Sequence, residues 1–251
     1  MTDYIKDKVL AVQEFVLLSG RALKSLLRPP RYPADVLIQM DTIGVGSLVI
    51  VLLTGFFSGA VLALQSYAAL VKFGATAQTG RMVALSVIRE MGPVMTALMV
   101  SGRNAAGIAS ELGSMTVTEQ VDAMRALGVD PIKKLVAPRV LATVIVLPLL
   151  TIIADFIGIF GGFLISYFLI KLSASQYWNT VYQVIEYSDI VQGLVKPFFF
   201  AFAISLVGCY YGLTTRGGTQ GVGRSTTQAV VAASILVFVL DFVITKFFVQ
   251  S

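Results

Sequence analysis

Five charged residues lie within or directly beside long apolar stretches of the sequence, namely Arg89, Glu90, Asp155, Lys196 and Asp241. A charge within membrane hydrocarbon costs roughly 2.5–3.5 kcal/mol on insertion scales, so function is the first hypothesis for such a group. A cationic side chain can hold a lipid phosphate while apolar walls accommodate the acyl chains. We therefore take Arg89, Glu90 and Lys196 as candidate lipid-binding residues. Arg89 or Lys196 would hold the phosphate, and Glu90 would orient the arginine or gate the site.

The same residues allow other interpretations. Arg89, Glu90 and Lys196 can instead form a structural ion pair that pins two helices together. Asp155 and Asp241 are more typical of helix packing or pairing, although with Glu90 they can form the proton relay of an ion-coupled secondary transporter. An intramembrane enzyme is a third function class, but the sequence has no paired catalytic constellation, and we assign no catalytic residue.

The composition excludes several kinds of protein. Of the 251 residues, 56% are apolar and 13% are charged, whereas about 25% are charged in an average soluble domain. The chain is too apolar for a soluble globular domain or for disorder. Because it has no histidine, Ser-His-Asp triads and histidine-bearing zinc sites are absent, and one cysteine, Cys209, cannot form an internal disulfide. No metal site is expected.

Five stretches are long and apolar enough to cross a bilayer, which takes about 20 residues of helix. They cover residues 42–71, 82–102, 140–170, 197–215 and 225–245. The sequence thus predicts an all-α integral membrane protein with five transmembrane helices. Glycines spaced as GxxxG predict close helix packing in lipid, and they form the pairs Gly55/Gly59, Gly158/Gly162 and Gly208/Gly212.

Residues 1–41 are expected to form an N-terminal interfacial amphipathic helix and elbow, followed by a transmembrane permease domain over residues 42–251. Apolar residues recur there at helical spacing, at Ile5, Val9, Val12, Val16, Leu23 and Leu27. A helix that packs on a soluble partner is the alternative. We expect Pro29, Pro30 and Pro33 to end this helix.

The basic residues predict the orientation of the chain. Most of the 19 Lys and Arg residues lie in segments 1–41, 103–139 and 212–225. By the positive-inside rule, these segments and the N-terminus are cytoplasmic, and five crossings place the C-terminus outside. The net charge of +5 is then a topology signal, and no nucleic acid is expected as a partner. On this topology, Glu90 and Lys196 lie roughly 15 and 10 Å along their helices from the outer ends.

The cytoplasmic loop before the third span is expected to carry a short helix at about residues 117–127. Thr116 and Glu119 match a capping box at its start, and Gly128 suits its end. A second short helix is predicted between Asp130 and Pro138. The first helix suits docking into a groove of a soluble partner, although an ordinary solvated connector is the alternative. The residues expected to dock are Glu119, Asp122, Met124, Arg125 and Leu127.

Three segments resemble the MlaE/YrbE family of ABC-transporter permeases. They are REMGP at 89–93, SGRNAAGIASELGSMTVTEQVDAMRALGVDP at 101–131, and GVGRSTTQAVVAASILVFVLDFV at 221–243. The similarity covers roughly residues 40–248. It implies a homodimeric permease that moves phospholipids or related lipids between the bacterial inner membrane and a conduit of MCE-domain proteins on the extracytoplasmic side.

The resemblance also implies partners and site roles. A separate ATPase would bind ATP, so no cofactor is expected in this chain, and a small STAS-type accessory protein would bind the ATPase. The helix at 117–127 corresponds to the coupling helix, and Arg89, Glu90 and Lys196 lie at the lipid cavity. Independently of the resemblance, Leu62 and Phe238 are expected tail contacts, chosen only because they lie on the first and fifth predicted spans.

A segment near the end of the chain approaches a nucleotide-binding motif. Residues 218–225 fit a Walker A loop except that Arg224 replaces the lysine, and the segment follows a membrane helix instead of a strand. We therefore expect a flexible cytoplasmic turn there, and no nucleotide binding.

Overall fold

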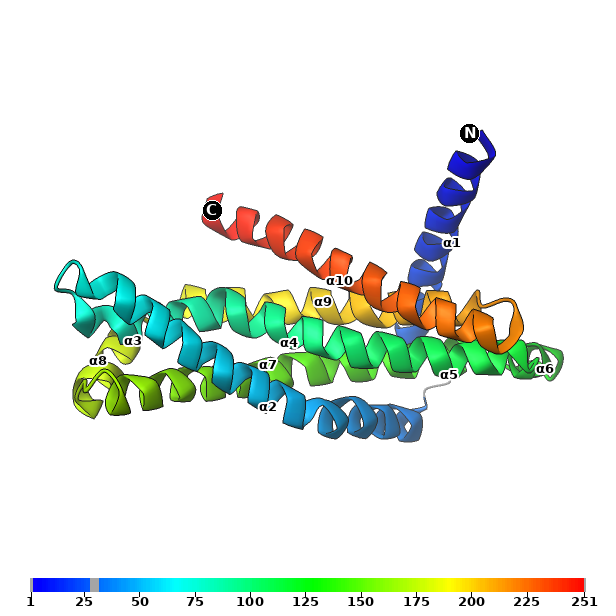
Figure 1. Cartoon of the computed structure of the whole chain (residues 1–251). Helices are drawn as coiled ribbons and strands as arrows, with labels where there is room; N and C mark the ends of the chain where they lie inside the picture. Colours follow the sequence, from blue (N-terminus) through cyan, green and yellow to red (C-terminus); the bar gives the residue numbers. More distant parts are fainter. Residues whose placement is uncertain (1, 28–31, 251) are drawn as a thin grey trace. The chain divides into compact units, whose positions relative to one another are not determined.

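A computed structural model describes residues 2–27 and 32–250 (Figure 1). Within these ranges the chain is helical and has no strand. Five helical stretches are long and apolar enough to cross a membrane: Pro33–Val71, Thr76–Val117, Ile132–Phe168, Tyr187–Leu213 and Gly218–Phe248. The predicted fold class, an all-α membrane protein with five spans, is confirmed.

The individual helices follow one another with short connections. The first two are α1 (Thr2–Leu27) and α2 (Pro33–Val71). The second span contains η1 (Thr76–Gln78), α3 (Thr79–Ser86), the π-helical η2 (Val87–Met91), α4 (Gly92–Val100), the π-helical η3 (Ser101–Ala105) and α5 (Ala106–Val117). Then come α6 (Gln120–Ala126), the π-helical η4 (Ile132–Val136), α7 (Ala137–Phe168), α8 (Ala174–Val184), α9 (Tyr187–Leu213) and α10 (Gly218–Gln250).

The chain forms two compact units, each assembled from three separate segments. Unit 1 comprises Met1–Ile43, Val100–Ile145 and Phe200–Val237, and unit 2 comprises Gly44–Met99, Val146–Phe199 and Phe238–Ser251. Long helices such as α2 contribute one part to each unit. We describe the two units separately.

The predicted boundary between residues 41 and 42 falls inside α2. This helix begins at Pro33, so Pro33 starts a helix instead of ending one. Proline suits the first turn, where its missing N–H would have no partner and its φ angle is already helical. Pro29, Pro30 and the side chains of Ile5 and Leu27 lie outside the described residues.

In unit 1, α1 packs along one face on a core that includes Ala22, Leu112 and Val140. Phe15 of α1 also meets Tyr210 edge-to-face at 5.8 Å. Other apolar residues of α1 remain exposed, at Val9, Val12, Val16 and Leu23. An interfacial position, with these residues in lipid, stays a prediction.

The cytoplasmic loop of unit 1 differs from the predicted capping box. Thr116 lies in the last turn of α5 and donates a hydrogen bond to the Leu112 carbonyl at 2.8 Å. Glu119 precedes α6 with a left-handed φ of 60° and makes no side-chain cap. The loop helix is therefore shorter than 117–127. The second short helix is also wrong as predicted, because Ile132 begins the continuous helix of the third span.

The flexible turn expected before Ser225 is also wrong. Helix α10 already begins at Gly218, so the connection from α9 covers only residues 214–217. Gly217 and Gly218 have φ angles of +92° and +66°. The segment that resembles a Walker A motif is thus helical, whereas a P-loop wraps its backbone around phosphate.

In unit 2, glycines let α2 and α7 approach closely, as predicted from their spacing. A Cβ on Gly59 would overlap the carbonyl oxygen of Gly158, and a Cβ on Gly55 would lie 3.0 Å from that of Ala154. Gly162 faces the Gly59 carbonyl in return. Any larger side chain at Gly59 must therefore separate the two helices.

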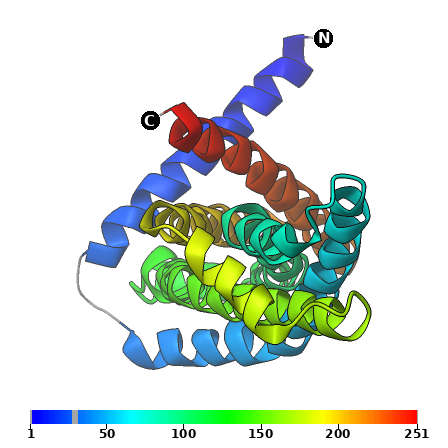
Figure 2. The same cartoon turned by 90° about the vertical axis from the view of Figure 1, so that its left-hand side faces the viewer.

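One end of unit 2 is built by α3 and α8, which lie side by side (Figure 1). Figure 2 looks at this end, with α3 in cyan and α8 in yellow-green. Tyr177 of α8 is buried, donates a hydrogen bond to the Ile159 carbonyl at 3.0 Å, and has a pKa raised by this burial. The sequence analysis did not predict α8.

Candidate functional site

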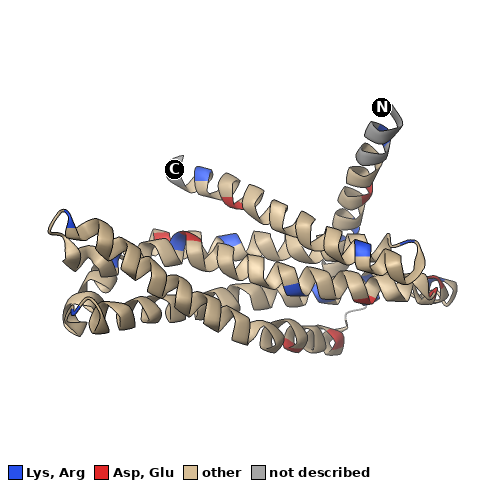
Figure 3. Cartoon of the chain, viewed as in Figure 1, with Lys and Arg blue, Asp and Glu red and all other residues tan. Residues whose placement is uncertain are grey.

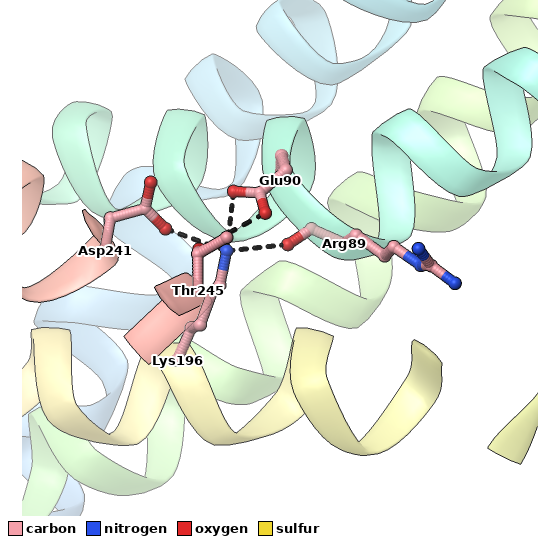
Figure 4. Close-up of polar contacts among 5 residues, drawn as sticks. All are labelled: Arg89, Glu90, Lys196, Asp241 and Thr245. Carbon is pink, nitrogen blue, oxygen red and sulfur yellow. Dashed lines mark hydrogen bonds and ion pairs between the residues drawn. The ribbon is translucent and has the colours of Figure 1, made fainter. Parts of the chain in front are cut away.

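A cluster of charged side chains joins three spans of unit 2 (Figure 4). The Lys196 ammonium on α9 lies 2.6 Å from Glu90 Oε2 on η2 and 2.8 Å from Asp241 Oδ1 on α10. Thr245 donates a hydrogen bond to Glu90 Oε1 at 3.3 Å. We call Glu90, Lys196, Asp241 and Thr245 the lysine cluster. An ion pair between the second and fourth spans, the alternative to lipid binding given above, is therefore present.

The lysine cluster also satisfies a backbone group. Pro93 has no N–H, so it cannot bond the Arg89 carbonyl four residues earlier, as a helix normally requires. Lys196 Nζ donates to that carbonyl at 2.9 Å. Because an unpaired carbonyl is costly inside a membrane, Lys196 stabilises the irregular helix at η2 as well as the two carboxylates.

A glycine explains how Lys196 comes so close. A Cβ on Gly193 would overlap the Ile88 carbonyl oxygen, so only glycine lets α9 lie against η2 at this point. Lys196 follows three residues later, on the same face of α9. The close contact therefore brings the Lys196 ammonium within bonding distance of Glu90.

The charge of the lysine cluster decides what it can bind. Lys196 is fully buried, with 0% of its side chain exposed, while Glu90 keeps 39% exposed. One cation faces two carboxylates, so the cluster carries a net negative charge if all three groups are ionised. The Lys196 ammonium has no free surface for a phosphate in this arrangement. Charged positions are few along the long helices, which sets this cluster apart (Figure 3).

Arg89 points away from the lysine cluster, although it neighbours Glu90 in sequence (Figure 4). Its Nε donates to Asp189 Oδ1 at 2.6 Å, and its Nη2 lies 2.5 Å from the same oxygen. Asp189 is buried, and its other oxygen accepts a hydrogen bond from the Glu186 backbone N–H at 3.0 Å. Asp189, and not Glu90 as expected, therefore orients Arg89.

Asp189 lies in the first turn of α9, and the sequence analysis assigned it no role. Its spacing of 100 residues from Arg89 carries no pairing signal. An acidic residue in the first turn of a helix is ordinarily explained by the helix dipole alone.

Asp155 lies apart from the lysine cluster. Its Oδ1 is buried, has no hydrogen-bond partner among the described residues, and occupies the place where a Cβ on Gly92 would lie. No hydrogen bond or ion pair joins Asp155 to Glu90 or Asp241 in the described part of the chain. The proton relay considered above therefore lacks a direct connection here.

The candidate docking residues of unit 1 lie on and beside α6 and differ in exposure. Asp122 and Arg125 are exposed and form an ion pair at 2.7 Å, and Leu127 is 81% exposed. Met124 instead packs on the core with Val121, three residues before it, so it offers little surface to a partner. Glu119 remains at the exposed start of the helix.

The expected tail contacts differ in exposure. Leu62 is partly buried against a core cluster of unit 2. Phe238 of α10 is 56% exposed. Across residues 2–27 and 32–250, no group of three or more His, Cys, Asp or Glu side chains could hold a metal ion.

Comparison with known proteins places these features in a family. The family model described as permease MlaE matches residues 36–247. A probable ABC transporter permease protein of Rickettsia felis is 45% identical over 238 residues, covering 95% of this chain and 92% of the relative.

Two further relatives carry more specific names. The intermembrane phospholipid transport system permease protein MlaE of Haemophilus influenzae is 39% identical, covering 82% of this chain and 80% of the relative. The chloroplastic protein TRIGALACTOSYLDIACYLGLYCEROL 1 of Arabidopsis thaliana is 35% identical, covering 94% of this chain and 67% of the relative. The family match spans all five membrane helices and the whole lysine cluster, and the chain belongs to the MlaE permease family.

Proposed function

We propose that this chain is the membrane-spanning subunit of an ABC transporter that moves phospholipids or related lipids. Membership of the MlaE permease family supports an ABC permease, and the name of the Haemophilus relative supports phospholipid as cargo. The observation that carries the lipid assignment is the set of charges held at one level of the apolar spans of unit 2, with Arg89 still 43% exposed.

The proposed assembly needs several partners. A separate ATPase hydrolyses ATP and docks on α6 through Glu119, Asp122 and Arg125, with Leu127 as the apolar contact and Met124 as support beneath. A homodimer encloses the lipid, because the most apolar stretches of α2 and α10 are largely exposed. Only 28% of this stretch in α2 and 17% in α10 is buried within the chain. An MCE-domain protein receives or supplies lipid on the extracytoplasmic side, and a small STAS-type protein binds the ATPase.

The proposed location is the bacterial inner membrane, with the N-terminus in the cytoplasm and the C-terminus outside. The distribution of Lys and Arg supports this orientation. It places α6 on the ATP side, and α3 and α8 on the side of the MCE protein.

Within the lipid site, we assign different roles to the three candidate residues. Arg89 binds the phosphate, because a guanidinium held by one carboxylate keeps further N–H groups available. Glu90 gates the site, since it is partly exposed and bonded to Lys196. Lys196 acts indirectly, because its own ammonium is buried, and it holds Glu90 in place.

The test uses the transporter reconstituted with its ATPase and MCE partners. Arg89→Ala and Glu90→Ala should each reduce lipid transfer more than they reduce assembly, and a photo-crosslinker at residue 90 should capture lipid in the dimer. Lys246→Ala, at an exposed lysine near the end of α10, serves as the control. If both variants transport normally and the crosslinker captures only protein, the charges are structural pins and the cavity lies elsewhere.

A further inference from the structure

Arg89 borders a second feature of unit 2, a polar cavity of about 280 Å³ between α3, η2 and the end of α8. Arg81 and Gln78 line it from the start of the second span. Gln183 and Glu186 line it from the segment before the fourth span. The lysine cluster does not line this cavity, so the two features can be tested separately.

The cavity contains both signs of charge in separate places. Arg81 and Glu186 are exposed and form no ion pair among the described residues, unlike Arg89, which is bound to Asp189. The lining carries two guanidinium groups and one carboxylate. Asp189, which pairs with Arg89 but does not line the cavity, brings the total charge of these groups to zero, so the lining offers both cationic and anionic groups. Amide side chains of Gln78 and Gln183 add neutral hydrogen-bonding groups.

We propose that this cavity binds the zwitterionic headgroup of a phospholipid, with phosphate at Arg81 and Arg89 and ammonium at Glu186. The proposal rests on the proposed lipid-transport function and names its substrate class. Guanidinium groups bind phosphate through charge-assisted hydrogen bonds, and a carboxylate accepts the same kind of bond from an ammonium group.

The size and charge of the cavity support a zwitterion over an anionic lipid. Sites for drug-sized ligands measure about 300–1,000 Å³, so this cavity fits a headgroup and not the acyl chains. A headgroup that has a phosphate but no ammonium would leave Glu186 unpaired beside a second negative charge. Such like-charge contacts are a common source of discrimination between ligands.

The experiment compares headgroups in the intact transporter with its partners. Vesicles contain equal amounts of phosphatidylethanolamine and phosphatidylglycerol, and a photo-crosslinker replaces Gln183 at the cavity wall. The protein should capture phosphatidylethanolamine in excess, and Glu186→Gln should reduce that excess at least about fivefold, as expected for loss of one charged hydrogen bond. Arg81→Gln should lower capture of both lipids.

Two exposed residues outside the cavity lining serve as matched controls. Tyr187→Phe changes the exposed neighbour of Glu186, and Lys72→Gln removes an exposed cation that does not line the cavity. Both should leave the headgroup ratio unchanged. Assembly with the ATPase, measured by co-purification, confirms that each variant is folded.

Several results would overturn the proposal. One is an unchanged ratio of captured phosphatidylethanolamine to phosphatidylglycerol in Glu186→Gln. The others are preferential capture of phosphatidylglycerol when the crosslinker is the only change, and capture of the MCE partner without lipid. If residue 183 captures no lipid while residue 90 does, the headgroup proposal fails and lipid transport stands. If neither position captures lipid and Arg89→Ala transports normally, the proposed lipid site itself fails.

Discussion

Removing the buried lysine is the most direct test of the lysine cluster. In Lys196→Met the side chain keeps a similar length but loses its charge, so Glu90 and Asp241 face each other without a cation. The Arg89 carbonyl also loses the hydrogen bond from Lys196, and Pro93, which has no N–H, cannot replace it. We expect a folded state that is strongly destabilised, with α9 and α10 held less firmly to η2.

The size of the effect follows from the burial of the three groups. Breaking a buried ion pair by removing one partner costs about 3–5 kcal/mol. Glu90 and Asp241 keep 39% and 20% of their side chains exposed, so solvent reduces the penalty toward the lower value. A loss of about 3 kcal/mol corresponds to more than a hundredfold change in the folding equilibrium.

Neutralising the carboxylates separates charge from shape. The triple variant Lys196→Met, Glu90→Gln, Asp241→Asn has no uncompensated charge, so it should recover much of the lost stability. Thermal unfolding of the detergent-purified protein measures both variants, and Lys246→Met at an exposed position of α10 is the control. A single variant as stable as the control, or a triple variant less stable than the single one, would refute the electrostatic reasoning.

Three other changes test the remaining assignments. Gly193→Ala should destabilise the protein by about 1–3 kcal/mol and lower lipid transfer, because its Cβ overlaps the Ile88 carbonyl, and thermal unfolding beside Gly223→Ala, where nothing lies within 4 Å, checks this. Glu119→Lys combined with Asp122→Lys should weaken co-purification of the ATPase while the thermal unfolding of the permease is retained, and unchanged co-purification and transport would contradict the docking role. The purified chain should release no phosphate from ATP, and turnover that Arg224→Ala abolishes would instead establish a nucleotide site in 218–225.

Much of the membrane fold could be predicted because the hydropathy of a span is a property of one continuous stretch of sequence. Each of the five spans contains an apolar run that the sequence reveals, yet every helix starts before its run. The extra turns, such as those from Pro33 to Asp41, contain polar residues that hydropathy excludes. Helix α8 was missed for the same reason, since it is polar and too short to cross a bilayer.

The short loop helix illustrates a different limit. Thr116 and Glu119 have the residue types and the spacing of a capping box, but α5 continues through Thr116. There the hydroxyl bonds Leu112 within its own helix, so it is not available as a cap. Tertiary packing extends the span and overrides the capping-box signal, which depends only on residues close together in the sequence.

The candidate site could be predicted in its residues but not in its pairings. Intramembrane charge alone identified Arg89, Glu90 and Lys196, whereas the partners of Arg89 and Lys196 lie on other helices. Because neighbouring side chains point about 100° apart around a helix, those of Arg89 and Glu90 face different partners, Asp189 and Lys196. The resemblance named both residues, and only the structure separates their surroundings.

This separation follows from a few backbone features and explains why two cations at similar depth differ. Pro93 leaves a carbonyl that needs a donor, and Gly193 brings α9 near enough for Lys196 to supply it. Lys196 therefore donates its hydrogen bonds to acceptors within the protein, and its burial keeps solvent and ligands away from the ammonium group. Arg89 points to the other side, where a single carboxylate fixes its plane but leaves N–H groups unused. A fixed, half-exposed guanidinium loses little conformational entropy when an anion binds, which is why we propose Arg89, and not Lys196, as the phosphate ligand.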